Sequence, residues 1–73
     1  MKKWLIDLTF KNGSCLQGMV KNTHTESGEV AKELLNGNDF TFGSMLSRDE
    51  TAHMLFKLGE LTTIVIKAGG DCN

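Results

Sequence analysis

The stretch FKNGSCLQG, residues 10–18, joins two apolar segments through Asn12-Gly13, a dipeptide typical of a tight turn between antiparallel strands. Residues 3–11, which lead into the turn, carry apolar side chains at every second position, Trp4, Ile6, Leu8 and Phe10. The residues that leave it, 14–21, form a second apolar segment of strand length. The sequence therefore predicts an antiparallel hairpin with one buried face.

The apolar pattern also decides the register of this hairpin. A two-residue turn would pair Phe10 with Cys15 and would mix core-facing with solvent-facing side chains. A three-residue loop instead pairs Leu8 with Leu16 and keeps the apolar face together, which is what sets register in a half-buried sheet. It also requires Gly13 in the left-handed conformation, which glycine adopts without steric cost. The same register pairs Ile6 with Gly18 and Trp4 with Val20.

One helix and three further strands are expected after the hairpin. Residues 22–37 contain the helix, which Thr25 or Ser27 can cap at its start. Its apolar stripe at helical spacing consists of Val30, Ala31, Leu34 and Leu35. Strands are predicted at 39–46, with Phe40 and Phe42 pointing inward, and at 51–57, with Ala52, Met54 and Phe56 on one side. A last strand is predicted at 62–67, which is rich enough in β-branched residues to be buried on both sides or paired at an interface.

The predicted order is β-β-α-β-β-β, which makes the chain an α+β protein. Five short strands with tight turns favour a small, strongly bent antiparallel sheet or a barrel of SH3-like or Sm-like type, with the helix inserted between strands two and three. Residues 1–67 are expected to form this single domain, and residues 68–73 to form a flexible tail.

Size and composition narrow the possible functions. A chain of 73 residues buries only about 60% of its unfolded surface, so association with a second copy is an expected source of stability. The net charge of −1 gives no reason to expect bulk binding to nucleic acid or to membranes. No apolar run has the length of a signal peptide or of a membrane span, which predicts a cytoplasmic protein. Two cysteines are too few for a disulfide framework, and we expect both to be free thiols, with Cys15 semi-buried and Cys72 mobile.

Two segments resemble the motifs of Sm-like proteins. The segment LTFKNGSCLQGMVK (8–21) is similar to the first Sm motif, and HMLFKLGELTTIVI (53–66) is similar to the second motif of the bacterial RNA-chaperone branch, the Hfq type. The resemblance implies ring oligomers, in which the last two strands pair between subunits, and RNA bound in the ring. Only Lys57 matches an RNA-contacting position of that family. Leu58 stands where the family has histidine, and the helix-bearing segment 22–38 replaces the loop that faces the RNA.

The candidate binding residues are polar or basic and lie at the ends of predicted strands. They are Lys21, Asn22, His24, Arg48 and Lys57, and in a barrel they can gather at one rim, where a lysine or arginine binds a phosphate. Candidate residues for an oligomer interface are Trp4, Ile64 and Ile66, and for Trp4 a place at the edge of the core is an equal alternative.

Catalytic and metal-binding patterns are not found in the sequence. His24, His53, Cys15 and Cys72 lack the spacing of a zinc site, so no metal is expected. Glu29 and Glu33 are better explained as the solvent face of the helix than as an acid–base pair. Without a phosphate loop or a nucleophile motif, the chain is predicted to need no cofactor and not to be an enzyme.

Three functions remain open at this point. The first is a homo-oligomeric binding protein that sequesters a small anionic ligand such as a signalling nucleotide. This hypothesis is based on a general resemblance, without a shared motif, to the short accessory proteins of phages and prophages. Some of those proteins sequester host signalling nucleotides. The second is a protein-binding inhibitor of a host complex, including a defence complex, that works through a sheet edge or the helix face. The third is a Sm-like RNA-binding module.

Overall fold

A computed structural model describes residues 1–71 and contains one antiparallel sheet of five strands with one α-helix. The predicted order and the position of the helix between the second and third strands are confirmed. The strand order across the sheet is β4-β3-β2-β1-β5, so β4 and β5 form its two edges. The elements are β1 (Lys2–Phe10), β2 (Cys15–Asn22), α1 (Ser27–Leu34), β3 (Phe42–Leu46), β4 (His53–Lys57), the 3₁₀ turn η1 (Leu58–Glu60) and β5 (Leu61–Asp71).

The hairpin of β1 and β2 has the register that the apolar pattern predicted. Leu8 lies opposite Leu16, and Ile6 lies opposite Gly18. Gly13 adopts a left-handed φ of 87°, as a bulged three-residue loop requires. The Asn12 side chain accepts a hydrogen bond of 2.9 Å from the backbone N–H of Ser14, which fixes the loop locally.

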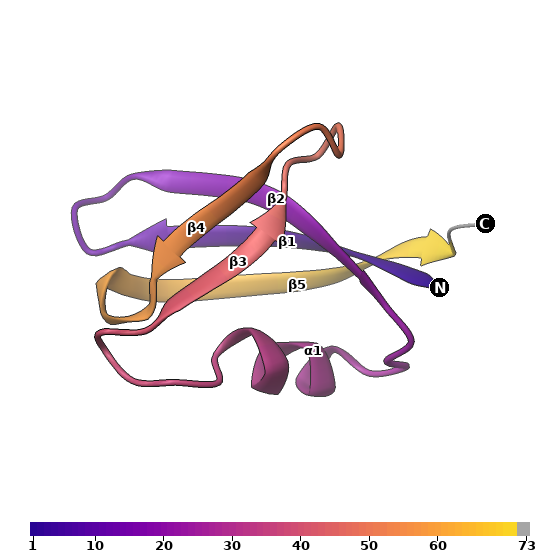
Figure 1. The fold of residues 1–73 in the computed structure, drawn as a ribbon, viewed down its shortest axis with the longest axis horizontal. Helices are drawn as coiled ribbons and strands as arrows, with labels where there is room; N and C mark the ends of the chain where they lie inside the picture. The colour runs from indigo at the N-terminus through magenta and orange to yellow at the C-terminus, as the bar shows by residue number, and fades with distance from the viewer. Residues whose placement is uncertain (72–73) are drawn as a thin grey trace.

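The sheet bends sharply after β2, so that β3 and β4 cross in front of β1, β2 and β5 (Figure 1). Only one pair of residues, Met19 and Leu46, joins β2 to β3 in the sheet. Gly18 lies directly beneath this crossing. A methyl group at Gly18 would stand 2.6 Å from Met45 Sδ and 2.7 Å from the Leu46 carbonyl oxygen. Glycine is therefore required where the two layers approach most closely.

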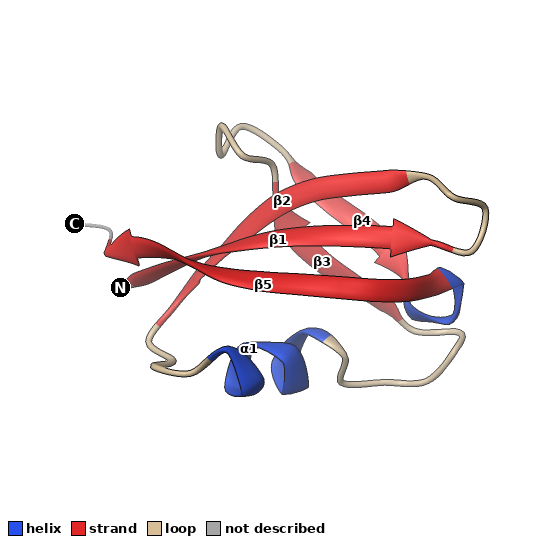
Figure 2. Ribbon diagram, turned by 180° about the vertical axis from the view of Figure 1, so that it is seen from behind, coloured by secondary structure: helices blue, strands red, loops and turns tan. Residues whose placement is uncertain are grey.

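The core fills the space between the two layers and is closed by the helix, which lies alongside β5 in both ribbon views (Figures 1 and 2). Val30 and Leu34, half of the predicted stripe, are the buried residues of α1. Burial of apolar side chains of this size stabilises the fold by roughly 1.5–3 kcal/mol each. The buried cluster consists of Trp4, Ile6, Leu8, Val30, Leu34, Met45 and Phe56.

The prediction that Phe40 and Phe42 point inward is wrong. Their side chains are 81% and 62% exposed. The reason is a turn before β3, in which the Asn38 side chain accepts a hydrogen bond of 2.9 Å from the backbone N–H of Phe40. This turn delays the start of the strand to Phe42, and the inward positions become Gly43 and Met45. The ring of Phe56 packs directly over Gly43, where a Cβ would lie 2.6 Å from ring carbons.

Several predicted boundaries and exposures also need correction. The helix begins at Ser27 without a side-chain cap, because the capping position is held by Glu26. The last strand continues to Asp71, beyond the predicted end at 67, because it pairs with β1 along most of that strand. It is covered on one side only, since Val65 is 41% exposed. Cys15 is exposed rather than semi-buried, Ala52 is exposed in the turn before β4, and Cys72 lies outside the described residues.

Candidate functional site

A groove opens where β2 and β3 separate after their single contact. Because β2 turns away toward α1 while β3 crosses the sheet, the two strands leave a wedge whose open end is spanned by the helix (Figure 1). The wedge contains a cavity of about 380 Å³, within the size range of small-molecule sites. Its lining comes from β2, α1, the residues after α1, β3 and the first residue of β4.

The floor of the groove is apolar, and its walls carry unpaired polar groups. Val20, Val30, Leu34 and Met45 contribute the apolar surface, and Phe42 adds a largely exposed aromatic ring. The polar walls include Asn36, Ser44 and His53, whose side chains form no hydrogen bond with any of residues 1–71. An apolar base with a few polar groups free to bond a ligand is the usual composition of a binding site.

The two charged residues of the lining, Lys21 and Glu33, are both held by partners at the rim. Lys21 forms an ion pair with Glu50 in the turn between β3 and β4, where Glu50 has a left-handed φ of 64°. Glu33 contacts the imidazole of His24 in the loop before α1. These pairs position one positive and one negative group on opposite walls of the groove.

His24 lies between two carboxylates of the helix. Its Nδ1 is 3.3 Å from Glu29 Oε2, and its Nε2 contacts Glu33. The hydrogen bond with Glu33, followed by the charge of Glu33 and the contact with Glu29, raises the pKa of His24 above its ordinary 6.5 despite partial desolvation. The two carboxylates contact different ring nitrogens, so the arrangement is an ion-pair clamp and not a chelate. Among the side chains that the structure describes, those of residues 1–70, no three of His, Cys, Asp or Glu are arranged to hold a metal ion.

Three of the five predicted binding residues lie together. Lys21 and Asn22 line the groove, and His24 adjoins it through Glu33. The Asn22 side chain also accepts a hydrogen bond of 3.1 Å from the backbone N–H of His24, which fixes the loop that leaves β2. The end of β2 and the loop after it thus bring these three of the five residues together.

Arg48 lies on the opposite side of the sheet from the core. Its Nε donates a hydrogen bond of 2.8 Å to the Gly18 carbonyl, and Nη2 donates one of 2.9 Å to Asp7 Oδ1. Asp7 belongs to the outward face of β1, because Ile6 and Leu8 on either side of it are buried. Arg48 thus fastens the β3–β4 turn to the back of the hairpin.

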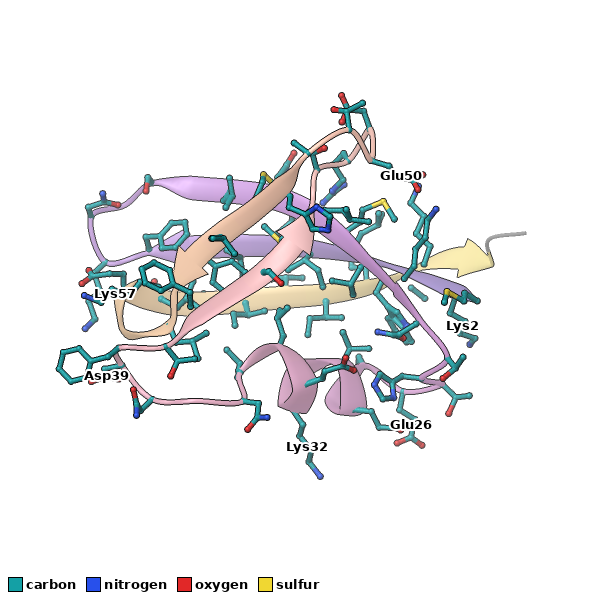
Figure 3. The ribbon with its side chains drawn as sticks, viewed as in Figure 1. Lys2, Glu26, Lys32, Asp39, Glu50 and Lys57 are labelled. Atoms are coloured by element: carbon teal, nitrogen blue, oxygen red, sulfur yellow. The ribbon has the colours of Figure 1, made fainter. Side chains whose placement is uncertain are left out.

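Lys57 lies at the end of the molecule remote from Glu50 and Glu26, beside Asp39 (Figure 3). Its Nζ is 5.8 Å from the centre of the Phe40 ring, within cation–π range. The neighbouring outer face of β3 and β4 is apolar, since Phe42 and Leu55 are 62% and 69% exposed. We define the outer patch as Phe40 and Leu55, since Phe42 at its edge also lines the groove.

The residues predicted for an oligomer interface point toward the core of the single chain. Trp4 is only 4% exposed, and its indole Nε1 has no hydrogen-bond partner among residues 1–71. Lys2 Nζ lies 5.8 Å from the centre of the Trp4 ring. Ile64 and Ile66 are half-buried against the core cluster.

Sequence reasoning missed the groove residues Glu33, Asn36, Ser44 and His53 as a group. They come from α1, the loop after it, β3 and β4, and they meet where β3 leaves its single contact with β2. One feature of the sequence could have indicated the groove. A helix inserted between strands two and three has to lie where these strands separate, and the groove forms there.

None of the helices described in residues 1–71 combines the length and apolar character needed to cross a membrane. Protein-family models, curated proteins and solved structures give no match to this chain. The function of the groove is therefore argued from its geometry.

Proposed function

We propose that the protein is a non-enzymatic binding protein that holds a small anionic ligand, such as a nucleotide, in the groove between α1, β2 and β3. The observation that carries the proposal is the groove itself, with an apolar floor and three polar side chains free to bond a ligand. A ligand with a flat apolar part and hydrogen-bonding edges matches this lining.

The distribution of groups suggests how such a ligand binds. The ring of a nucleobase would lie against Val20 and the aromatic side chain of Phe42, apolar lining residues that are not buried. Asn36 and Ser44 offer donors and acceptors to the edge of the base. An anionic group would lie toward Lys21, the basic side chain of the lining, and a ring N–H of His53 offers a further hydrogen-bond donor.

Binding without chemistry is supported by the state of the titratable groups. Lys21 and Glu33 are engaged in ion pairs at the rim, with Glu50 and His24. Acid–base catalysis by a pair of side chains needs two proton-transferring groups aimed at the ligand, and among the described lining residues these ion pairs leave only His53.

We further propose that copies of the chain associate and that the bent sheet is a barrel of the SH3-like or Sm-like kind. The support is the outer patch beside the edge strand β4, because large apolar side chains exposed together mark interaction surfaces. The same patch favours a second candidate function, the docking of a partner protein, as expected for an inhibitor of a larger complex.

A titration by NMR tests the ligand proposal. Cyclic AMP and cyclic GMP serve as probes, and the backbone amide shifts of the isotope-labelled protein report where they bind. We expect the largest shifts around Asn36, Ser44 and His53, with weaker binding in Asn36→Ala. The matched control is Lys32→Ala, because Lys32 projects from α1 away from the sheet (Figure 3). Shifts confined to the outer patch, or equal binding in the two variants, would contradict a ligand site in the groove.

A further inference from the structure

The groove contains one acidic side chain whose effect on an anion depends on a neighbour. Glu33 lines the cavity, and an uncompensated carboxylate there repels a ligand of the same charge. Its partner, the His24 imidazole, is the kind of side chain whose charge changes near neutral pH. The net charge of this wall therefore depends on the protonation of His24.

The surroundings of His24 favour its protonated form. From α1, the facing charged groups are Glu29, at 3.3 Å from Nδ1, and Glu33 at Nε2. From β2, the facing group is the neutral Asn22 amide, which holds the His24 backbone. Both carboxylates raise the pKa of His24, Glu33 more strongly, so the imidazolium persists to a higher pH than in an isolated histidine.

We propose that His24 is a positioning residue that sets the charge of the groove wall through Glu33, so that the groove binds an anionic ligand more tightly when the imidazole is protonated. This inference rests on the proposed ligand site. The imidazolium holds the Glu33 carboxylate at the rim and offsets its charge. Neutral imidazole leaves that charge uncompensated in the lining.

The direction of the effect follows from the titration. Ligand affinity is high below the raised pKa of His24 and falls as the pH rises through it. A unit charge a few ångströms from a solvent-exposed ligand changes affinity by about threefold to tenfold. His53 also lines the groove, so its contribution must be separated from that of His24.

The test measures cyclic AMP binding by NMR at about pH 5.5 and about pH 8.5, on either side of the histidine range. A cyclic phosphodiester keeps one negative charge throughout, so the probe adds no pH dependence of its own. We expect the dissociation constant of the wild type to rise about threefold to tenfold between these pH values. His24→Gln should remove most of that change, and His53→Gln should retain it. Glu33→Gln should bind tightly at both pH values.

The outcomes separate this inference from the proposed function. Equal affinity at the two pH values overturns the role of His24 but leaves the ligand site in place. A pH dependence that survives in His24→Gln and disappears in His53→Gln also overturns it. Absence of binding at both pH values removes the ligand site and the inference together.

The imidazole resonances of the free protein add a check without ligand. Glu33→Gln should lower the pKa of His24, and an unchanged value would refute the clamp.

Discussion

Replacing Gly18 with alanine tests the bend on which the groove depends. The added methyl group would lie 2.6 Å from Met45 Sδ and 2.7 Å from the Leu46 carbonyl oxygen. The methionine side chain can move aside, but the carbonyl belongs to the one residue pair that joins β2 to β3. Relief of the contact therefore requires displacement of the backbone at the crossing.

The cost should be at the upper end of the range for overpacked cores, about 2–3 kcal/mol. For a domain of this size, each kcal/mol lowers the melting temperature by about 4–8 °C, so a fall of about 10–20 °C is expected. Circular dichroism during thermal and urea unfolding measures both quantities. Cyclic nucleotide binding should weaken as well, because β2 and β3 would no longer diverge from the same point.

Gly28→Ala provides the matched control. Gly28 lies in the first turn of α1, and a methyl group there has no heavy atom within 4 Å. Alanine favours the helix, so stability should stay the same or rise by up to ~1 kcal/mol. If Gly18→Ala is as stable as Gly28→Ala, the close crossing of β3 over β2 is wrong, and with it the origin of the groove.

Three further changes probe the turns that hold this geometry. Gly13→Ala should cost about 1–2 kcal/mol in urea unfolding, because Gly13 has a φ of 87° that disfavours a side chain, and an unchanged midpoint would refute the bulged loop. Arg48→Met should cost about 1 kcal/mol through loss of its hydrogen bonds to the Gly18 carbonyl and Asp7, and Asp7→Asn should retain more of this stability. Hydrogen bonds from the hydroxyl of Ser47 and then from Thr51 lower the pKa of Asp49 from 3.8 to about 2. The stability that Asp49 contributes is therefore present above pH ~4 and lost as the pH falls toward ~2, and Asp49→Asn should flatten that part of the acid unfolding profile, whereas an unaltered profile would contradict the assignment.

The hairpin could be predicted from the sequence because it depends on residues close in the chain. Apolar side chains at every second position from Trp4 to Phe10 left one register that kept Leu8 and Leu16 on the same face, and that register required a left-handed Gly13. The order of the elements followed in the same way, since each has its own periodic pattern.

The inward positions of β3 could not be read from alternation alone. Phe40 and Phe42 have the spacing of a buried face, but the side chain of Asn38 stabilises a turn that delays the strand. The decisive fact for the strand is tertiary: the ring of Phe56 packs over Gly43, which assigns that side of β3 to the core.

The candidate site was predictable in part. Lys21, Asn22 and His24 are neighbours in sequence, so their gathering follows from the end of one strand. Arg48 and Lys57 were grouped with them because both are basic and end a strand or occupy a turn. Their separation depends on the direction in which β3 and β4 cross the sheet, and local sequence does not determine that direction.

Native mass spectrometry of the protein purified from cells tests the central claim, a ligand-binding protein that assembles from identical copies. The account predicts a homo-oligomer that retains a small anionic molecule, and loss of that molecule in Asn36→Ala but not in Lys32→Ala. A monomer that carries no small molecule, and that takes up neither cyclic AMP nor cyclic GMP when they are added, would contradict the account.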